Sequence, residues 1–295
     1  MSGRVWFITG ASSGLGRLMT EHLLARGERV AATARRIESL DDLATIHRER
    51  LWRARLDVTD TVAIRRVVAD ACAALGSIDV LVSNAGYMLL GAAEELRDED
   101  ITHQLNTNLV GPIQLIRAVL PRMRGQGGGR IIQISSEAGQ MVYPALGLYH
   151  ATKWGIEGFC EALMMEVAPL NIKVTLVQPG RVATQIDANA VVTEPVLDVY
   201  KNSAVGMCFR LHSMGRFRPI SDPVKVADAI LALADMEEPP RRLTLGSDGY
   251  RNVSRALGRR LSELERQKEA AEATDIRSPA ESGEDNRMTT AGNKD

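Results

Sequence analysis

Residues Val5–Gly16 have the sequence VWFITGASSGLG, a short apolar run followed by three closely spaced glycines. The run Val5–Ile8 predicts a buried strand, and a helical pattern of leucines begins after Gly16. Glycines between a strand and a helix let a pyrophosphate approach the main chain and the helix N-terminus. We therefore interpret Gly10, Gly14 and Gly16 as a dinucleotide-binding turn, although their spacing differs from the commoner G-x-G-x-x-G. A plain tight turn is the alternative.

The rest of the chain alternates in the same way. Apolar runs predict six further strands, at residues 29–36, 51–59, 78–83, 130–135, 174–177 and 241–246. Helical patterns occupy residues 38–50, 61–75, 101–123, 149–168 and 223–236. This alternation predicts an α/β fold: one Rossmann-type, doubly wound parallel sheet of about seven strands with helices on both faces.

The C-terminal part has a different pattern. Val253, Leu257, Leu261 and Leu264 fall at helical spacing with charges between them, and residues from Ala273 onward are polar without periodicity. We expect one domain over residues 1–250, a C-terminal helix over 251–272 and a disordered tail over 273–295.

The composition excludes several classes of protein. The 295 residues are 45% hydrophobic with a formal net charge of −1, so nucleic acid and anionic membranes are not expected partners. Cys72, Cys160 and Cys208 form no CxxC and fit a reducing compartment, and the five histidines show no metal-ligand spacing. The chain shows neither a signal peptide nor an apolar run that could span a bilayer, so we expect a cytoplasmic protein without a metal.

The second predicted strand ends in Ala34, Arg35 and Arg36. In a βαβ unit an acidic residue here would bind the adenosine ribose of NAD. Guanidinium groups instead suit a ribose 2′-phosphate, because they donate paired hydrogen bonds. The two arginines therefore predict NADP(H) over NAD(H), with Arg35 favoured; two solvated arginines at a helix start are the alternative.

Residues Ser136–Lys153, SEAGQMVYPALGLYHATK, carry the candidate chemistry. Tyr149 and Lys153 are four residues apart, which on a helix places their Cβ atoms about 5–6 Å from each other. An ammonium beside a phenol favours the phenolate and makes a better proton donor and acceptor. Ser136 could hold a carbonyl oxygen at the end of the strand 130–135. An exposed Tyr–Lys pair on an ordinary amphipathic helix is the alternative.

Together, these motifs resemble the short-chain dehydrogenase/reductase family over roughly residues 4–250, and especially its NADP-preferring, hydroxysteroid and retinol dehydrogenase-like members. The resemblance implies a proton-transfer role for Tyr149, and for Lys153 the roles of binding the nicotinamide ribose and lowering the pKa of Tyr149. It also implies that Ser136, with Ser135 as a rival, orients the substrate oxygen. Asn108 would anchor a water in a proton relay to Lys153, or it is a satisfied core amide.

The resemblance implies a set of cofactor-binding residues that follow strand ends. These are Gly10, Ser12, Ser13, Gly14, Leu15, Gly16, Arg35, Arg36, Asp57, Val58, Asn84, Ala85, Gly86, Tyr149, Lys153, Pro179, Gly180, Val182 and Thr184. Many NADP-preferring members carry a basic residue where this chain has Ser13, so the NADP(H) prediction depends on the two arginines.

Residues 185–220 are expected to form a substrate lid. Its apolar side chains could line a pocket or pack the lid onto the body: Val191, Val192, Val196, Leu197, Tyr200, Met207, Phe209, Leu211 and Met214. We expect an NADP(H)-dependent oxidoreductase acting on a bulky, largely apolar ketone or secondary alcohol. The alternatives are an NADP(H)-binding sensor without turnover and an epimerase or dehydratase on the same fold. The resemblance also implies a homodimer or homotetramer built through residues 101–123 and 149–168.

Overall fold

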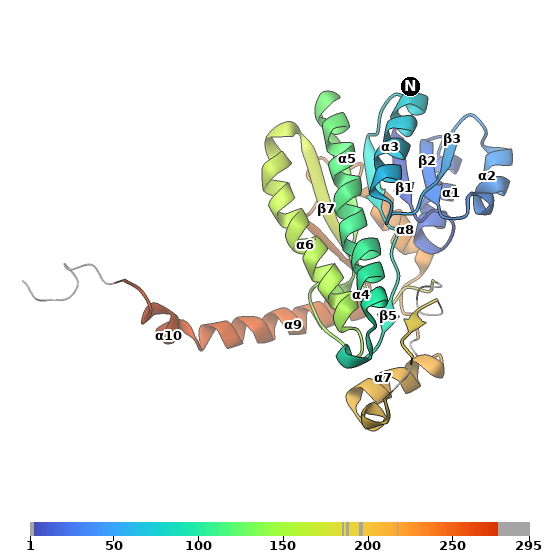
Figure 1. The fold of residues 1–295 in the computed structure, drawn as a ribbon. Coiled ribbons are helices and arrows are strands. Elements are labelled where there is room, and N and C mark those ends of the chain that lie inside the picture. The colour runs from blue at the N-terminus through green and yellow to red at the C-terminus, as the bar shows by residue number, and fades with distance from the viewer. Residues whose placement is uncertain (1–2, 185, 187–188, 195–196, 217, 277–295) are drawn as a thin grey trace, which may run out of the picture. The chain divides into compact units, whose positions relative to one another are not determined.

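The computed structural model describes residues 3–184, 186, 189–194, 197–216 and 218–276. Within this part of the chain, seven parallel strands form one sheet in the order β3-β2-β1-β4-β6-β7-β9 (Figure 1). The predicted parallel sheet of about seven strands is therefore confirmed. The strands of this sheet are β1 Val5–Thr9, β2 Arg29–Ala34, β3 Leu51–Arg55, β4 Val80–Ser83, β6 Gly129–Ile134, β7 Ile172–Pro179 and β9 Arg242–Leu245.

Helices cover both faces of the sheet. Those of the body are α1 Gly14–Ala25, α2 Asp41–Ile46, α3 Thr61–Leu75, α4 Asp98–Leu105, α5 Gly111–Gly125, α6 Gly147–Val167 and α8 Pro223–Ala232. Helices α1 and α8 pack on one face, and α3, α5 and α6 pack on the other (Figure 1). Successive residues of β1 point to opposite faces, so Trp6 and Ile8 join the first hydrophobic cluster and Phe7 joins the second. Because both faces of the sheet are buried, its strands appear in the sequence as continuous apolar runs.

The strand order reverses at β1, which has β2 on one side and β4 on the other. In open parallel sheets the crevice outside the carboxyl ends of the strands at such a point is where ligands bind. The glycine turn after β1 and Asn84 after β4 both lie at this edge. The topology thus gathers residues that are far apart in the sequence.

The predicted helix over residues 101–123 is formed, but its middle is not α-helical. A π-helical turn, Asn106–Val110, separates α4 from α5. The apolar periodicity of the sequence does not indicate this turn. Gly111 follows the turn and lies so close to β3's exit that a Cβ there would be 2.5 Å from the Val58 carbonyl oxygen. The turn buries Asn108, which is 2% exposed.

Two other predicted elements are shorter than expected. The helix over 38–50 is a 3-10 turn, Ile37–Leu40, followed by α2. The third strand ends at Arg55 because the next residues make a turn that caps α3, where the Asp60 carboxylate accepts the N–H groups of Val62 and Ala63. Boundaries like these depend on capping side chains, which are a weaker signal than apolar periodicity.

The expected lid contains structure that the sequence pattern did not indicate. Strand β8, Val191–Val192, pairs in parallel with β5, Leu89–Leu90, and α7 spans Ala204–Ser213. The buried Glu95 carboxylate accepts the N–H of Ala92 at 2.7 Å and that of Leu197 at 2.8 Å. Glu95 therefore ties the lid to the segment after β5.

The chain divides into two compact units, residues 1–254 and 255–295. Helix α9, Ser247–Glu265, crosses this boundary, and α10 spans Lys268–Glu272. The predicted C-terminal helix over 251–272 is thus formed as two helices. Nearly all of the expected tail, from residue 277, lies outside the described residues.

Candidate active site

Tyr149 and Lys153 lie on the same face of α6 and are both buried, with 5% and 7% of their surface exposed. The Lys153 ammonium donates to the main-chain oxygen of Ile134 at 3.0 Å and lies 5.6 Å from the centroid of the Tyr149 ring. Ile134 is the last residue of β6, so the pair sits against the carboxyl end of a central strand. This burial contradicts the alternative of an exposed surface pair.

The surroundings of Lys153 favour loss of its proton. Burial lowers the pKa of the Lys153 ammonium to about 8, and the charge of Glu157 opposes that change. A shift of this size is typical of groups that take part in proton transfer. The pKa of Lys153 therefore lies below that of an exposed lysine.

Two serines follow β6, and their hydroxyl groups have different partners. Ser135 is buried and donates to Glu157 at 2.7 Å. The Ser136 hydroxyl oxygen accepts the N–H of Ala138 at 3.1 Å and caps a 3-10 turn, Glu137–Gly139. Ser136 is only partly buried and accepts rather than donates in this contact, so its proton is available to another oxygen.

His150 holds the loop between Ser136 and Tyr149, a role that sequence reasoning missed. Its Nε2 accepts the N–H of Tyr143 at 2.8 Å, so its Nδ1 carries the proton and donates to Ala138 at 2.9 Å. Burial lowers the pKa of His150, which keeps this neutral form. The spacing of His150 next to Tyr149 was visible in the sequence, but its two main-chain partners depend on the path of the loop.

The Asn108 amide is satisfied by protein groups. It donates to the Tyr87 carbonyl at 2.8 Å and to the Thr152 hydroxyl at 3.4 Å, and it accepts the Tyr87 N–H at 3.1 Å. These bonds attach the segment after Asn84, Ala85 and Gly86 to α6 beside Lys153. The side chain is thus a satisfied core amide, and a water relay at Asn108 stays a prediction.

The turn between β1 and α1 has glycine at three positions where a side chain would cause strain or a clash. Gly10 and Gly14 have φ values of 68° and 53°, and a Cβ at Gly16 would be 2.3 Å from the Gly10 carbonyl oxygen. The Asn84 amide donates to the Thr9 carbonyl at 3.0 Å, and the Thr9 hydroxyl accepts the N–H of Asn84 at 3.0 Å. These two hydrogen bonds therefore hold the turn against the end of β4.

The N-terminus of α1 is open at this edge of the sheet. Ser13 is exposed and its side chain makes no capping hydrogen bond, and Ser12 is partly buried beside it. Leu15 points the other way and packs against the first hydrophobic cluster. The main-chain N–H groups of the first helical turn are left for an anion, as a pyrophosphate requires. The chain's own residues thus fit a dinucleotide at this turn.

The adenosine side of this edge is basic. Arg35 and Arg36 directly follow β2 and are exposed. Asp57 is exposed, and burial would raise its pKa, but hydrogen bonds from Thr59 and the nearby charge of Arg35 lower it overall. Val58, the next residue, is buried.

The loop after β7 approaches the glycine turn from the other side. A Cβ at Gly180 would be 2.5 Å from Asp248, whereas the side chain of Thr184 is 3.7 Å from the position of a Cβ at Gly14. Pro179 ends β7, and Val182 is buried and bridges to Ser221. The structure thus brings Thr184, one of the expected nicotinamide-side residues, to the glycine turn.

The expected lid residues do not share one environment. Phe209 packs with Leu90, Ala145 and Cys208. By contrast, several of the others are exposed: Val191, Val192, Met207 and Met214. The Tyr200 hydroxyl donates to Glu94 at 2.6 Å, Leu197 and Leu211 are partly buried, and Val196 lies outside the described residues.

Neither a cluster of metal-ligand side chains nor a helix able to span a membrane is found among the described residues. No group of three or more His, Cys, Asp or Glu side chains in that part of the chain could hold a metal ion. None of the described helices combines the length and the apolar composition that crossing a membrane requires.

The chain is similar in sequence and in fold to known proteins. The family model described as short chain dehydrogenase matches residues 4–195. A short-chain dehydrogenase from Streptomyces avermitilis is 39% identical and superposes with a TM-score of 0.86 over 93% of this chain and 99% of that one. The 3-ketodihydrosphingosine reductase of Bacteroides thetaiotaomicron is 38% identical over 197 residues, 66% of this chain and 70% of that protein.

The similar structures include one that is complexed with NADP+. The closed form of a serine dehydrogenase complexed with NADP+ is 28% identical, with a TM-score of 0.71, over 82% of this chain and 94% of that one. The family model covers well over half of the chain, and the Streptomyces structure covers nearly all of it. The chain therefore belongs to the short-chain dehydrogenase family and is an oxidoreductase of that family.

Proposed function

We propose that the protein is an NADP(H)-dependent oxidoreductase that interconverts a bulky, largely apolar ketone and its secondary alcohol. The observation that carries the proposal is the buried Tyr149–Lys153 pair, held against the end of β6 by the bond from Lys153 to Ile134. Ser136 follows the same strand end, and the glycine turn lies at the same edge of the sheet. A proton donor, an orienting hydroxyl and a dinucleotide turn are thus available at one edge.

The cofactor would be held by groups that leave space or donate hydrogen bonds. The pyrophosphate would lie against Gly14 and the N-terminus of α1, with Ser12 and Ser13 beside it. Asp57, Val58 and the Asn84–Gly86 segment would border the adenosine half. Pro179–Gly180, Val182 and Thr184 would border the nicotinamide, whose chemistry when bound is hydride exchange with the substrate carbon. Lys153 would bind the nicotinamide ribose.

The chain's own residues supply the proton and the orientation. In ketone reduction the Tyr149 O–H bond breaks and the same proton forms an O–H bond on the substrate oxygen. Ser136 donates a hydrogen bond to that oxygen and orients the carbonyl. The Lys153 ammonium stabilises the Tyr149 phenolate that remains, and solvent returns one proton to it through Lys153. Each carbonyl group thus gains one hydride from the reduced cofactor and, in net terms, one proton from solvent. The product is one alcohol.

The preference for NADP(H) rests on the residues after β2. Arg35 and Arg36 are exposed at the adenosine side, and no carboxylate follows them directly. Guanidinium groups suit a 2′-phosphate in charge and in geometry. The similar serine dehydrogenase structure holds NADP+, which supports the same choice.

The substrate class rests on the apolar lid and on one relative. Phe209 lies with Leu90 and Ala145 in an apolar cluster that joins the lid to the loop before Tyr149. A similar protein is named 3-ketodihydrosphingosine reductase, so its name indicates a ketone on a long lipid chain. We therefore propose ketones with long alkyl chains as the first substrates to assay.

The deciding experiment follows the nicotinamide absorbance of the purified protein with a panel of ketones of increasing chain length. Each ketone is assayed with NADPH and with NADH. We expect turnover with NADPH and a specificity constant that rises with chain length. Binding of NADPH without turnover across the whole panel would support a sensor and overturn the oxidoreductase proposal.

A further inference from the structure

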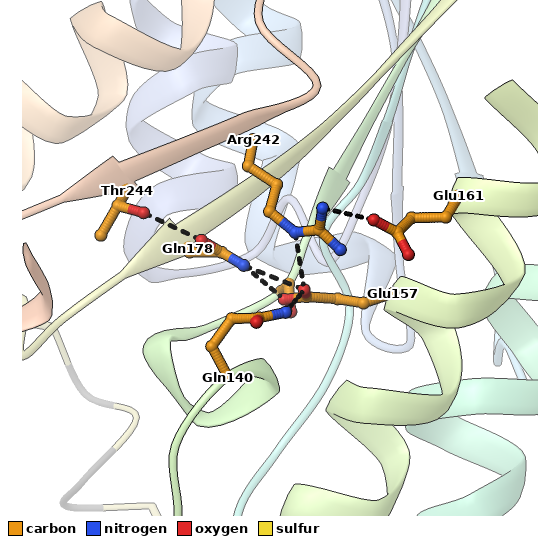
Figure 2. Close-up of polar contacts among 7 residues, drawn as sticks. Gln140, Glu157, Glu161, Gln178, Arg242 and Thr244 are labelled. Carbon is orange, nitrogen blue, oxygen red and sulfur yellow. Dashed lines mark hydrogen bonds and ion pairs between the residues drawn. The ribbon is translucent and has the colours of Figure 1, made fainter. Parts of the chain in front are cut away.

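Glu157 is buried on α6, one helical turn after Lys153 and two turns after Tyr149. Its carboxylate accepts hydrogen bonds from Ser135 at 2.7 Å, from Gln140, and from Gln178 at 2.9 Å. The Arg242 guanidinium donates to it at 3.2 Å (Figure 2). The four donors come from the end of β6, the loop after it, β7 and β9. One carboxylate therefore joins four segments of the chain.

In the sequence, three of these donors, Ser135, Gln140 and Gln178, lie close to proposed site residues. Ser135 directly precedes Ser136, and Gln178 directly precedes Pro179–Gly180. Gln140 lies in the loop that leads from Ser136 to Tyr149. The bonds to Glu157 therefore set the positions of two strand ends relative to the helix that carries Tyr149 and Lys153.

The surroundings of Glu157 require a group that only accepts hydrogen bonds. A hydroxyl, two amide NH₂ groups and a guanidinium all face it, and Gln178 is itself oriented because its other side-chain atom accepts the Thr244 hydroxyl at 2.9 Å (Figure 2). An ionised carboxylate is acceptor-only, whereas a glutamine would turn an NH₂ group toward these donors. The packing is tight as well, because a Cβ at Gly139 would be 2.1 Å from the nearer Glu157 oxygen.

We propose that Glu157 is a positioning residue of the reductase site, which holds Ser136 and Pro179–Gly180 in place against α6 and keeps a negative charge beside Lys153. This proposal rests on the proposed function. Glu157 touches neither substrate nor cofactor and acts through Ser135, Gln178 and Lys153.

The charge of Glu157 predicts the direction in which the pKa of Lys153 should change when that charge is removed. The groups that face Lys153 are Tyr149 and Glu157 on its own helix and the Ile134 carbonyl on β6. Arg242 on β9 faces Glu157 from the other side and also pairs with Glu161 at 2.5 Å. Burial lowers the pKa of Lys153 and Glu157 raises it, so loss of the carboxylate charge should lower that pKa further.

The test compares Glu157→Gln with the wild-type protein in ketone reduction over a range of pH. We expect kcat to fall by about 10²-fold through misplacement of Ser136 and the nicotinamide side. We also expect the alkaline limb of the pH profile of kcat to move to lower pH. NADPH affinity, measured by fluorescence, should change much less than kcat, because none of the four donors to Glu157 belongs to the pyrophosphate turn.

Three control variants distinguish the effect of Glu157 on the position of its neighbours from the effect of its charge on Lys153. Glu157→Asp keeps the charge and should restore the alkaline limb, although its shorter reach lowers kcat. Ser135→Ala removes one donor and should lower kcat without moving the limb. Glu166→Gln removes an exposed charge from the same helix and should resemble the wild-type protein.

Two outcomes overturn the proposal while leaving the proposed function intact. One is a Glu157→Gln protein with wild-type kcat, and the other is an equal loss at every pH without a shift of the limb. If Glu157→Gln does not fold, as judged by thermal unfolding, unchanged kcat in Ser135→Ala overturns the positioning role. Absence of turnover in the wild-type protein across the whole ketone panel would instead overturn the proposed function itself.

Discussion

The Lys153 ammonium donates to the Ile134 carbonyl and at the same time lies 5.6 Å from the centroid of the Tyr149 ring. One bond therefore connects the end of a central strand to the pair of side chains on α6. Neither residue of the pair is free to turn toward bulk solvent, because both are buried. The first two predictions follow from this geometry.

Replacement of Tyr149 by phenylalanine removes the phenol and keeps the ring. We expect turnover to fall by at least about 10²–10⁴-fold, the usual contribution of a positioned acid or base. NADPH affinity should stay within a few-fold of wild type, since the ring still fills its place. Steady-state kinetics and NADPH fluorescence titration measure the two effects, and retained turnover would remove Tyr149 from its proposed role.

The pKa of Lys153 predicts a pH dependence. Burial lowers this pKa to about 8, so the ammonium is present below that pH and is lost above it. The ammonium stabilises the phenolate that Tyr149 becomes in reduction, so kcat for ketone reduction should fall as the pH rises through about 8. Rates measured at saturating NADPH from pH 6 to pH 10, roughly the range in which such groups titrate, test this. A flat profile across that range would contradict the assignment.

Arg35→Ala should weaken NADPH binding much more than NADH binding. Loss of a hydrogen bond to a charged group costs about 1.5–3 kcal/mol, which corresponds to about 10-fold to 150-fold in the dissociation constant. Arg66→Ala is a suitable control, because Arg66 is exposed on α3. Isothermal titration with both cofactors measures the difference, and equal losses for NADPH and NADH would count against the 2′-phosphate contact.

Two glycine substitutions should change the free energy of unfolding in opposite directions. A Cβ at Gly16 would overlap the Gly10 carbonyl oxygen, so Gly16→Ala should lower the free energy of unfolding by about 1–3 kcal/mol and weaken cofactor binding. Gly158 is an exposed residue inside α6, and apart from its chain neighbours and the backbone of its own helix no described atom lies within 4 Å of an added Cβ. Gly158→Ala should therefore stabilise the protein by about 0.5–1 kcal/mol. Thermal unfolding of both variants checks this, and two stabilised proteins would show that the turn is looser than described.

Exposed apolar residues on the helices of one face predict self-association. Trp154 and Met165 on α6 are 41% and 70% exposed, and Val110 in the π-helical turn is 36% exposed. These residues lie on the segments that the family resemblance implies as the oligomer interface. We expect a homodimer or homotetramer in light scattering, and Met165→Glu should shift it toward monomers. A monomeric wild-type protein would contradict this.

Sequence reasoning worked best where the signal was local. The strand, glycine turn and helix around Gly10 follow from apolar periodicity and from residues that allow positive φ. The Tyr149–Lys153 spacing placed both side chains on one helical face. The lid's small sheet of β5 and β8 was not predictable in this way, since two-residue strands have no periodicity.

The roles of neighbouring residues needed the tertiary structure. Ser135 and Ser136 are adjacent, and only the contact of Ser135 with Glu157 assigns the first to the interior. Glu157 repeats the four-residue spacing that links Tyr149 to Lys153, so extending that pattern by one turn could have singled it out. Its donors on β7 and β9 could not have been found, because they are distant in the chain.

By itself, the sequence determined the alternating α/β pattern, the glycine turn and the residue types of the candidate site, because these depend on neighbours within one or two turns of the chain. The tertiary structure decided which side chains are buried, which serine faces α6 and how Lys153 loses the solvation of an ordinary lysine. Burial and hydrogen bonding between distant residues are properties of strand order and helix packing, and these exist only once the chain is folded.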